Sequence, residues 1–240
     1  MKRFFDVLIS LLCLILLSPI FLLFMFLIWL QDYASPLYIS SRVGRNGKNF
    51  QMVKLRSMIV NADKRGVDST AIDDERITRI GHFIRKYKLD EFFQLWNVLC
   101  GHMSIVGPRP NVQRGVELYT EKERHLLDIR PGITDFASIV FYDEGDILCG
   151  SIDPDLRYNQ IIRPWKSRLG LLYVEKQTLL LDLKIILLTA ISIFSRQLAL
   201  DGLQRTLNNL GADSLLIKIS SRKKPLQPYP PPGSKNALRI

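Results

Sequence analysis

The chain has 240 residues, of which 47% are hydrophobic and 23% are charged, and its formal net charge is +10. This length suits one compact domain with appendages. Three widely spaced cysteines exclude a disulfide framework and a cysteine zinc site, and the three histidines have no metal-ligand spacing. Most of the excess positive charge follows Leu215, which favours anionic lipid headgroups as partners and argues against nucleic acid.

The first element is an apolar segment, residues 7–30, that contains no charged side chain. As a helix it would extend about 36 Å, enough to cross a bilayer core of about 30 Å. Pro19, which follows Ser18, divides the segment near its middle and predicts a kink or a break. Two topologies fit this pattern: a kinked helix that spans the membrane, or a re-entrant helix that enters and leaves by the same face.

The charges on both sides of this segment favour the re-entrant helix. Lys2 and Arg3 precede it, and Arg42, Arg45 and Lys48 follow it. Basic residues prefer the cytoplasmic side of a membrane, and only a re-entrant helix keeps both flanks there. The spanning helix remains open as the alternative.

The next elements are a hairpin and two helices. Residues 38–58 alternate in polarity around an Asn-Gly turn at 46–47, which predicts a β-hairpin. Apolar residues at helical spacing predict a helix over 77–87. A further helix is expected to begin at or just after Asp90 and to end before Gly101.

The last third of the chain predicts helices followed by a tail. Residues 178–194 are apolar but contain Asp182 and Lys184, which favours a helix at the membrane interface or packed on the domain over a second span. A short helix over 198–210 follows. From Ser220 onward the basic, proline-rich chain is expected to be extended and to lack a core.

These elements predict an α/β fold that is mainly helical, with a small β-hairpin, an N-terminal re-entrant membrane helix and amphipathic interfacial helices. Three parts are expected along the chain: a membrane helix (1–33), a cytoplasmic catalytic domain (34–195) and a basic, proline-rich C-terminal extension (196–240).

The carboxylate pair Asp90-Glu91 is the main candidate for chemistry. An isolated Asp before a helix is most often an N-cap, and that interpretation stays open here. The candidate phosphate-binding cations are Lys54, Arg56, Arg85 and Arg109. Cations keep a carboxylate ionised, two carboxylates with phosphate oxygens suit Mg²⁺, and an ionised Asp can attack phosphorus. The residues therefore permit phosphoryl transfer at a membrane surface.

The motifs resemble those of the bacterial sugar transferases, the monotopic phosphoglycosyl transferases. The resemblance runs from Lys2 to about Ala190 and rests on motifs in a fixed order. They are Lys2-Arg3-Phe4-Phe5-Asp6, Ser18-Pro19, Arg42-Val43-Gly44-Arg45-Asn46-Gly47, Lys54-Leu55-Arg56-Ser57-Met58, Arg76-Ile77-Thr78, Leu89-Asp90-Glu91, Gln94-Leu95-Trp96-Asn97-Val98, Met103-Ser104-Ile105-Val106-Gly107-Pro108-Arg109-Pro110 and Arg130-Pro131-Gly132-Ile133-Thr134.

This resemblance implies a membrane-bound phosphoglycosyl transferase. It would move a sugar 1-phosphate from a nucleotide sugar, with UDP as the expected nucleotide, to polyprenol (undecaprenyl) phosphate and release UMP. That reaction is the priming step of exopolysaccharide, O-antigen or glycoconjugate synthesis. The implied location is the bacterial inner membrane, with the catalytic domain on the cytoplasmic face. Membrane lipids, a second copy of the chain or later glycosyltransferases are the implied partners, and nucleic acid is not one.

The resemblance also implies roles for individual residues. Asp90 would attack the sugar-bearing phosphate and form a covalent phosphosugar intermediate, and Glu91 would bind Mg²⁺. Arg85 and Arg109 match family arginines near the phosphates. Ser18-Pro19 matches the family's break in the re-entrant helix.

Three positions depart from the family's usual pattern. Phe93 replaces a proline, His102 replaces an acid, and Asp135 replaces a glycine. If the acid orders the site, its loss at His102 would reduce activity. The departure and the long extension therefore motivate an alternative function, a catalytically impaired membrane scaffold of a polysaccharide assembly complex.

Overall fold

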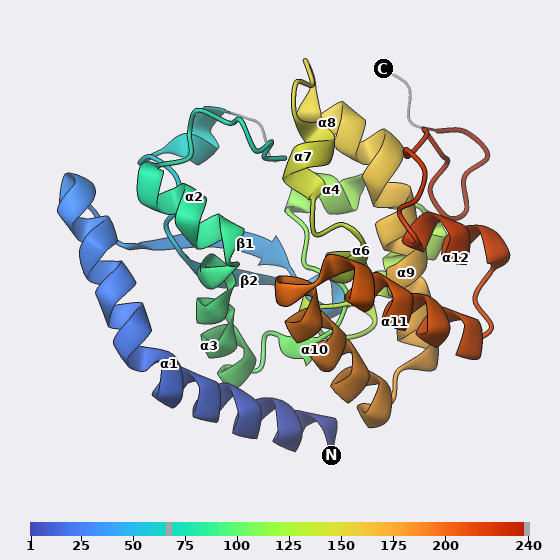
Figure 1. The fold of residues 1–240 in the computed structure, drawn as a ribbon, viewed down its shortest axis with the longest axis horizontal. Helices are drawn as coiled ribbons and strands as arrows, with labels where there is room; N and C mark the ends of the chain where they lie inside the picture. Colours follow the sequence, from blue (N-terminus) through green and yellow to red (C-terminus); the bar gives the residue numbers. More distant parts are fainter. Residues whose placement is uncertain (66–68, 238–240) are drawn as a thin grey trace.

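The computed structural model describes residues 1–65 and 69–237 and confirms a mainly helical fold with a small hairpin (Figure 1). The elements are α1 (Lys2–Asp32), β1 (Leu37–Val43), β2 (Asn49–Leu55), α2 (Arg79–Lys86), α3 (Gln94–Leu99), β3 (Ser104–Val106), α4 (Gln113–Glu117), α5 (Glu121–Arg124), β4 (Gly132–Thr134), α6 (Phe136–Val140), α7 (Glu144–Leu148), α8 (Pro154–Arg157), α9 (Arg163–Lys176), α10 (Leu179–Phe194), α11 (Arg196–Asn209) and α12 (Ser214–Ser220).

The predicted hairpin is present. Strands β1 and β2 pair antiparallel, with Leu37 opposite Leu55 at the open end. Asn46 and Gly47 at the turn both have positive φ angles, of 57° and 73°. Asparagine and glycine tolerate this left-handed conformation better than other residues, which explains the turn. A second, parallel pair of short strands, β3 with β4, was not predicted.

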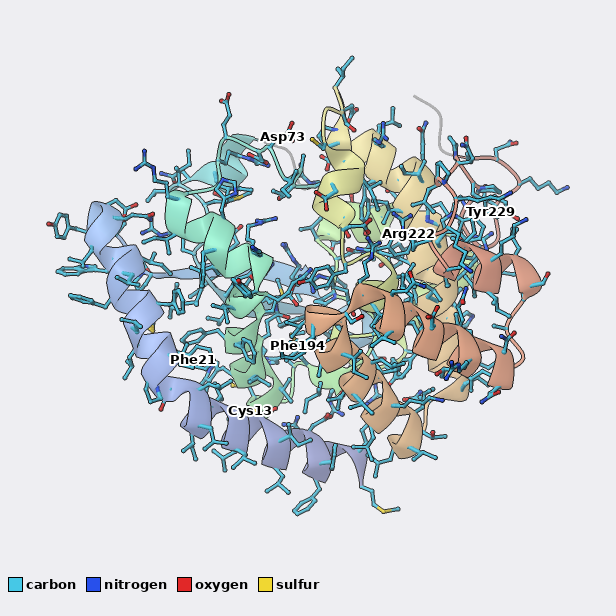
Figure 2. All side chains as sticks on the ribbon, in the orientation of Figure 1. Cys13, Phe21, Asp73, Phe194, Arg222 and Tyr229 are labelled. Atoms are coloured by element: carbon cyan, nitrogen blue, oxygen red, sulfur yellow. The ribbon has the colours of Figure 1, made fainter. Side chains whose placement is uncertain are left out.

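Helix α1 is apolar, long and largely uncovered by the rest of the chain. It runs through Pro19 without interruption, but Figure 1 shows it bent, with one half beneath α3 and α10 and the other rising beside α2. The bend lies close to Phe21, labelled in Figure 2. By length and composition α1 can enter a membrane. Its bend agrees with the predicted kink.

Both ends of α1 are bound to the same folded body. At its start, Lys2 Nζ lies 2.5 Å from the buried carboxylate of Asp182 on α10. At its end, Asp32 accepts two hydrogen bonds of 2.6 Å from the guanidinium of Arg56, just after β2. A straight helix of this length would extend about 46 Å. The bend therefore brings both ends of an apolar helix back to one body.

The main core lies between α6, α9, α10 and α11. Phe136, Trp165, Tyr173 and Leu203 are all buried within it. Helix α10 packs its Leu181, Ile185 and Leu188 into this core and leaves a second apolar face exposed. The exposed side chains of that face include Leu180, Leu183, Leu187 and Phe194. Helix α10 thus packs on the domain and is apolar on its outer face. This agrees with the prediction of a helix at the membrane interface or packed on the domain.

The C-terminal extension packs more than the sequence predicted. Helices α11 and α12 contribute Leu200, Leu203, Leu207 and Leu216 to the main core. The expectation of a tail without a core is wrong for its described part, because the Tyr229 ring stacks on that of Trp165, with 4.4 Å between the ring centres. Residues 238–240 lie outside the described residues, and the division of the chain at residue 195 stays a prediction.

Candidate active site

Asp90 and Glu91 lie on a 3-10 turn, Leu89–Phe93, between α2 and α3. Helix α3 begins only at Gln94, and the Asp90 side chain caps neither helical segment, so the N-cap interpretation is wrong. Asp90 is 9% exposed, and no described residue donates a hydrogen bond to its carboxylate. A buried carboxylate normally has such donors. The lone pairs of Asp90 are thus left free for a ligand or a reacting atom.

Aromatic packing fixes this turn against the membrane helix. The rings of Phe92 and Phe93 lie 5.8 and 5.1 Å from that of Phe21 in α1. Phe93 also packs against the small core of Ile28, Leu55 and Ile84. The departure from proline at position 93 thus supplies an apolar anchor. It attaches the carboxylate pair to the bend of α1.

Glu91 is held by the arginine of the proline-rich turn. Arg109, between Pro108 and Pro110, donates a 2.6 Å hydrogen bond to Glu91 Oε1. Burial opposes a charge on Glu91, but Arg109 and Lys88 outweigh it and lower the pKa of Glu91 to about 2. In return, the Glu91 carboxylate raises the pKa of Arg109. This ion pair is therefore fully charged at neutral pH.

Asp90 is affected differently by the same surroundings. Burial, followed by the charge of Glu91, raises the pKa of Asp90, while Lys54, Arg85 and Arg109 act to lower it. The predicted residues Lys54, Arg85 and Arg109 therefore all lie close enough to act on Asp90. Burial and the neighbouring Arg109 lower the pKa of Lys54 itself to about 8. The site is a cluster of cations around two carboxylates, which suits a phosphate-bearing substrate.

Arg56, unlike Lys54, Arg85 and Arg109, is bound to the end of α1. It is 7% exposed, and both of its terminal nitrogens bind Asp32 at the end of α1. This pairing fixes α1 to the hairpin and occupies the groups that would bind phosphate. The geometry gives no support to the predicted phosphate contact of Arg56.

Three residues near the site were missed from the sequence. Lys166 of α9 forms an ion pair with Glu144 of α7, and its Nζ lies 5.1 Å from the centre of the Tyr158 ring. Glu144 also contributes to raising the pKa of Arg109. No local signal in the sequence marked Glu144, Lys166 or Tyr158 as part of the site. Glu144 on α7, Tyr158 on the π-helical turn before α9, and Lys166 on α9 meet only in the folded chain.

The remaining departures are explained locally. Asp135 caps α6, where its side chain accepts a 2.7 Å hydrogen bond from the Ser138 amide. His102 is exposed and stacks on Phe50, with 5.7 Å between ring centres. Neither residue donates a hydrogen bond to Asp90.

The fit of the site to Mg²⁺ depends on its carboxylates. In the part of the chain that the structure describes, no group of three or more His, Cys, Asp or Glu could hold a metal. Glu91 Oε2 and the Asp90 carboxylate accept no hydrogen bond from a described residue. Mg²⁺ commonly takes one or two carboxylates and completes its shell with substrate phosphates and water. The pair therefore fits Mg²⁺ bound together with a phosphate substrate.

Comparison with known proteins identifies the family of this chain. The model of the family described as bacterial sugar transferase matches residues 1–196. The chain is 42% identical over 148 residues to the exopolysaccharide production protein ExoY of Sinorhizobium fredii, covering 55% of this chain and 66% of that protein. It is 34% identical over 207 residues to the uncharacterized sugar transferase EpsL of Bacillus subtilis, covering 86% and 91%.

A third relative carries a more specific name. The chain is 42% identical over 133 residues to a putative undecaprenyl-phosphate N-acetylgalactosaminyl 1-phosphate transferase of Bacillus subtilis, covering 55% of this chain and 70% of that protein. Other relatives are longer: the match covers only 31% of the UDP-galactose-lipid carrier transferase of Erwinia amylovora. The family match over residues 1–196, with the predicted motifs in place, shows that this chain belongs to the bacterial sugar transferase family.

Proposed function

We propose that this protein is a membrane-bound phosphoglycosyl transferase that moves a sugar 1-phosphate from a UDP-sugar to undecaprenyl phosphate. The names of relatives that act on undecaprenyl phosphate support the acceptor. The observation that carries the proposal is the Asp90 carboxylate, which is buried, accepts no hydrogen bond from a described residue and lies near Lys54, Arg85 and Arg109. Such a carboxylate is placed to act as a nucleophile toward phosphorus.

The proposed reaction has two displacements at phosphorus. An Asp90 oxygen attacks the sugar-bearing phosphorus, the bond to the nucleotide's bridging oxygen breaks, and UMP leaves with that electron pair. An oxygen of undecaprenyl phosphate then attacks the phosphosugar on Asp90 and releases the carboxylate. Lys54, Arg85 and Arg109 would offset the charge on the phosphoryl oxygens. Glu91 would hold Mg²⁺, which supplies further charge neutralisation of the donor phosphates when bound.

The apolar α1 supports membrane association, and we propose that the site faces the cytoplasm of the bacterial inner membrane. Undecaprenyl phosphate is a lipid, so its phosphate must meet Asp90 at the membrane surface. The packing of Phe92 and Phe93 on Phe21 supports this placement, because it attaches the carboxylate turn to α1 itself. An assembly with a second copy or with later glycosyltransferases stays a prediction.

The test is the variant Asp90→Asn in the full-length protein in detergent or nanodiscs. Loss of the nucleophile is expected to lower transfer of labelled sugar phosphate into a lipid extract by roughly 10⁴-fold or more. Intact-mass measurement after incubation with donor alone should show a phosphosugar adduct on the wild type and none on the variant. The exposed Asp128 supplies the matched control, since Asp128→Asn should keep both signals.

Release of nucleoside monophosphate distinguishes the enzyme from the scaffold alternative. A scaffold would release no nucleoside monophosphate from any UDP-sugar, with or without Mg²⁺. Mg²⁺-dependent release by the wild type would exclude it. Full turnover by Asp90→Asn would instead overturn Asp90 as the nucleophile.

A further inference from the structure

A cavity of about 220 Å³ lies where the start of α1 meets the loop before β4. It is lined by Lys2, Arg3, Asp6, Arg45, Ser104, Ile129, Arg130 and Gln177. Four of these residues are cationic and one is acidic. The cavity therefore combines a hollow large enough for a phosphate group with a strong excess of positive charge.

Two arginines of this lining are fixed in place and still free to bind. The Arg45 Nε donates a 3.0 Å hydrogen bond to the Asp128 carbonyl oxygen, and the Arg130 Nε donates one of 3.0 Å to that of Gly101. No described residue forms a hydrogen bond or ion pair with the terminal nitrogens of either. Each guanidinium is thus oriented through one nitrogen and offers its other two, a geometry suited to phosphate oxygens.

The other charges of the lining are already engaged. Lys2 is paired with Asp182, and the terminal nitrogens of Arg3 donate to the carbonyls of Val98 and Leu99. Asp6 accepts hydrogen bonds from the Ser104 hydroxyl and the Ile105 amide. Among the described residues, the charged groups of the lining that have terminal atoms without a partner are thus those of Arg45 and Arg130.

The cavity lies at the membrane helix and away from the catalytic turn. Lys2 and Arg3 are the first residues of α1, and Phe4 and Leu8 directly after them are exposed. This places the cavity at the depth of lipid headgroups if α1 enters the bilayer. Arg3 binds the carbonyl end of α3, whereas Asp90 lies on the 3-10 turn before its amino end, so the whole of α3, about 9 Å at helical rise, lies between them.

We propose that this cavity binds the phosphate group of an anionic membrane lipid that is not the reacting acceptor. Asp90 does not line the cavity, so a phosphate bound there is not in place to attack the phosphosugar on that residue, as the acceptor phosphate must. Arg45 and Arg130 form the two-pronged contact, and the bound headgroup holds the N-terminal half of α1 at the membrane surface. The proposal rests on membrane insertion of α1 and not on the chemistry of Asp90.

The test measures thermal unfolding of the full-length protein in neutral detergent micelles. Phosphatidylglycerol should raise the unfolding temperature in a saturable way, whereas phosphatidylcholine and inorganic phosphate should not. The double variant Arg45→Gln/Arg130→Gln should weaken the apparent affinity for phosphatidylglycerol by about 30-fold, from two lost headgroup contacts. The matched control is Arg157→Gln/Arg205→Gln, which removes two exposed arginines on α8 and α11 and should bind as the wild type does.

Each other outcome overturns the proposal. If the control variant lost as much affinity for phosphatidylglycerol, the effect would come from net charge and not from this cavity. An unchanged affinity in the double variant would remove the cavity as the site. Protection by inorganic phosphate that the double variant loses would assign the cavity to a soluble phosphate. The unfolding temperature without lipid checks that the variant folds. Adduct formation at Asp90 is measured separately, so failure of the lipid site can be told apart from failure of the proposed enzyme activity.

Discussion

At the scale of residues, the two adjacent carboxylates differ because their partners differ. Glu91 has a direct arginine partner and its pKa is about 2, whereas burial raises the pKa of Asp90. Opposite shifts in neighbouring groups are a common sign of divided roles in a site. Glu91 is suited to remain ionised, and Asp90 is suited to attack phosphorus with a free lone pair. Activity should therefore be lost on acidification at the raised pKa of Asp90, while the charge of Glu91 is retained down to about pH 2.

Lys54 gives a prediction for alkaline pH. Its pKa of about 8 means that the free enzyme loses this cation as the pH rises through 8. If Lys54 binds donor phosphate, kcat/KM should fall by about tenfold per pH unit above that value. Lys54→Arg should remove this decline, because arginine stays charged. The exposed Lys48 is the control, and Lys48→Arg should show the same decline of kcat/KM as the wild type. A decline shared by the wild type and Lys54→Arg would assign it to another group.

At the scale of elements, two glycines bring the Arg109 turn to its place. Strands β3 and β4 approach so closely that the Gly107 amide donates to the Thr134 carbonyl at 3.0 Å, and the Gly132 amide donates to that of Pro108 at 3.0 Å. A Cβ on Gly132 would lie 2.1 Å from the Gly107 nitrogen. Two motifs far apart in the sequence are therefore one structural unit. Its function is to present Arg109 to Glu91.

Gly132→Ala tests this unit. The added methyl group should force β3 and β4 apart, lower stability by about 1–3 kcal/mol and lower kcat/KM by displacing Arg109. Thermal unfolding and donor kinetics measure the two effects. At Gly115 in α4 the nearest atom to an added Cβ lies at 3.6 Å, so Gly115→Ala should be tolerated. Wild-type behaviour of Gly132→Ala would contradict the close approach.

At the scale of the whole molecule, the attachment of both ends of α1 favours the re-entrant topology. A spanning helix would place its two ends on opposite sides of the bilayer, but Lys2 and Asp32 bind residues of one folded body. The buried partner of Lys2 is Asp182, whose charge would be left uncompensated if the pair were broken, at a cost of about 3–5 kcal/mol. Bending α1 keeps both contacts.

Cysteine labelling tests the topology. In a variant without Cys13, Cys100 and Cys149, one new cysteine is placed before Lys2 and another at Ser41. Both should react with an impermeant maleimide from the same side of sealed vesicles, because both flanks lie on one face. Vesicles of opposite orientation supply the control and should protect both. Labelling of the two positions from opposite sides would establish the spanning helix.

Sequence reasoning succeeded where the signal is local. The apolar run of α1, the Asn-Gly turn of the hairpin and the helical spacing of α2, α10 and α11 all follow from neighbours in the chain. It failed for Arg56, because an arginine beside Lys54 gives no sign that its partner is Asp32, a residue at the end of another element. It also missed β3 and β4, since strands of three residues are too short to show alternation.

The apolar N-terminal segment, the order of the motifs and the carboxylate pair could all be identified from the sequence, because they depend on residue type and on short spacing. Three facts are visible only in the folded molecule: Asp90 is no N-cap, Lys166 and Glu144 border the site, and Tyr229 packs on Trp165. Each of these facts depends on contacts between segments far apart in the chain. Burial and charge partners arise only when such segments meet, and they separate the role of Asp90 from that of Glu91.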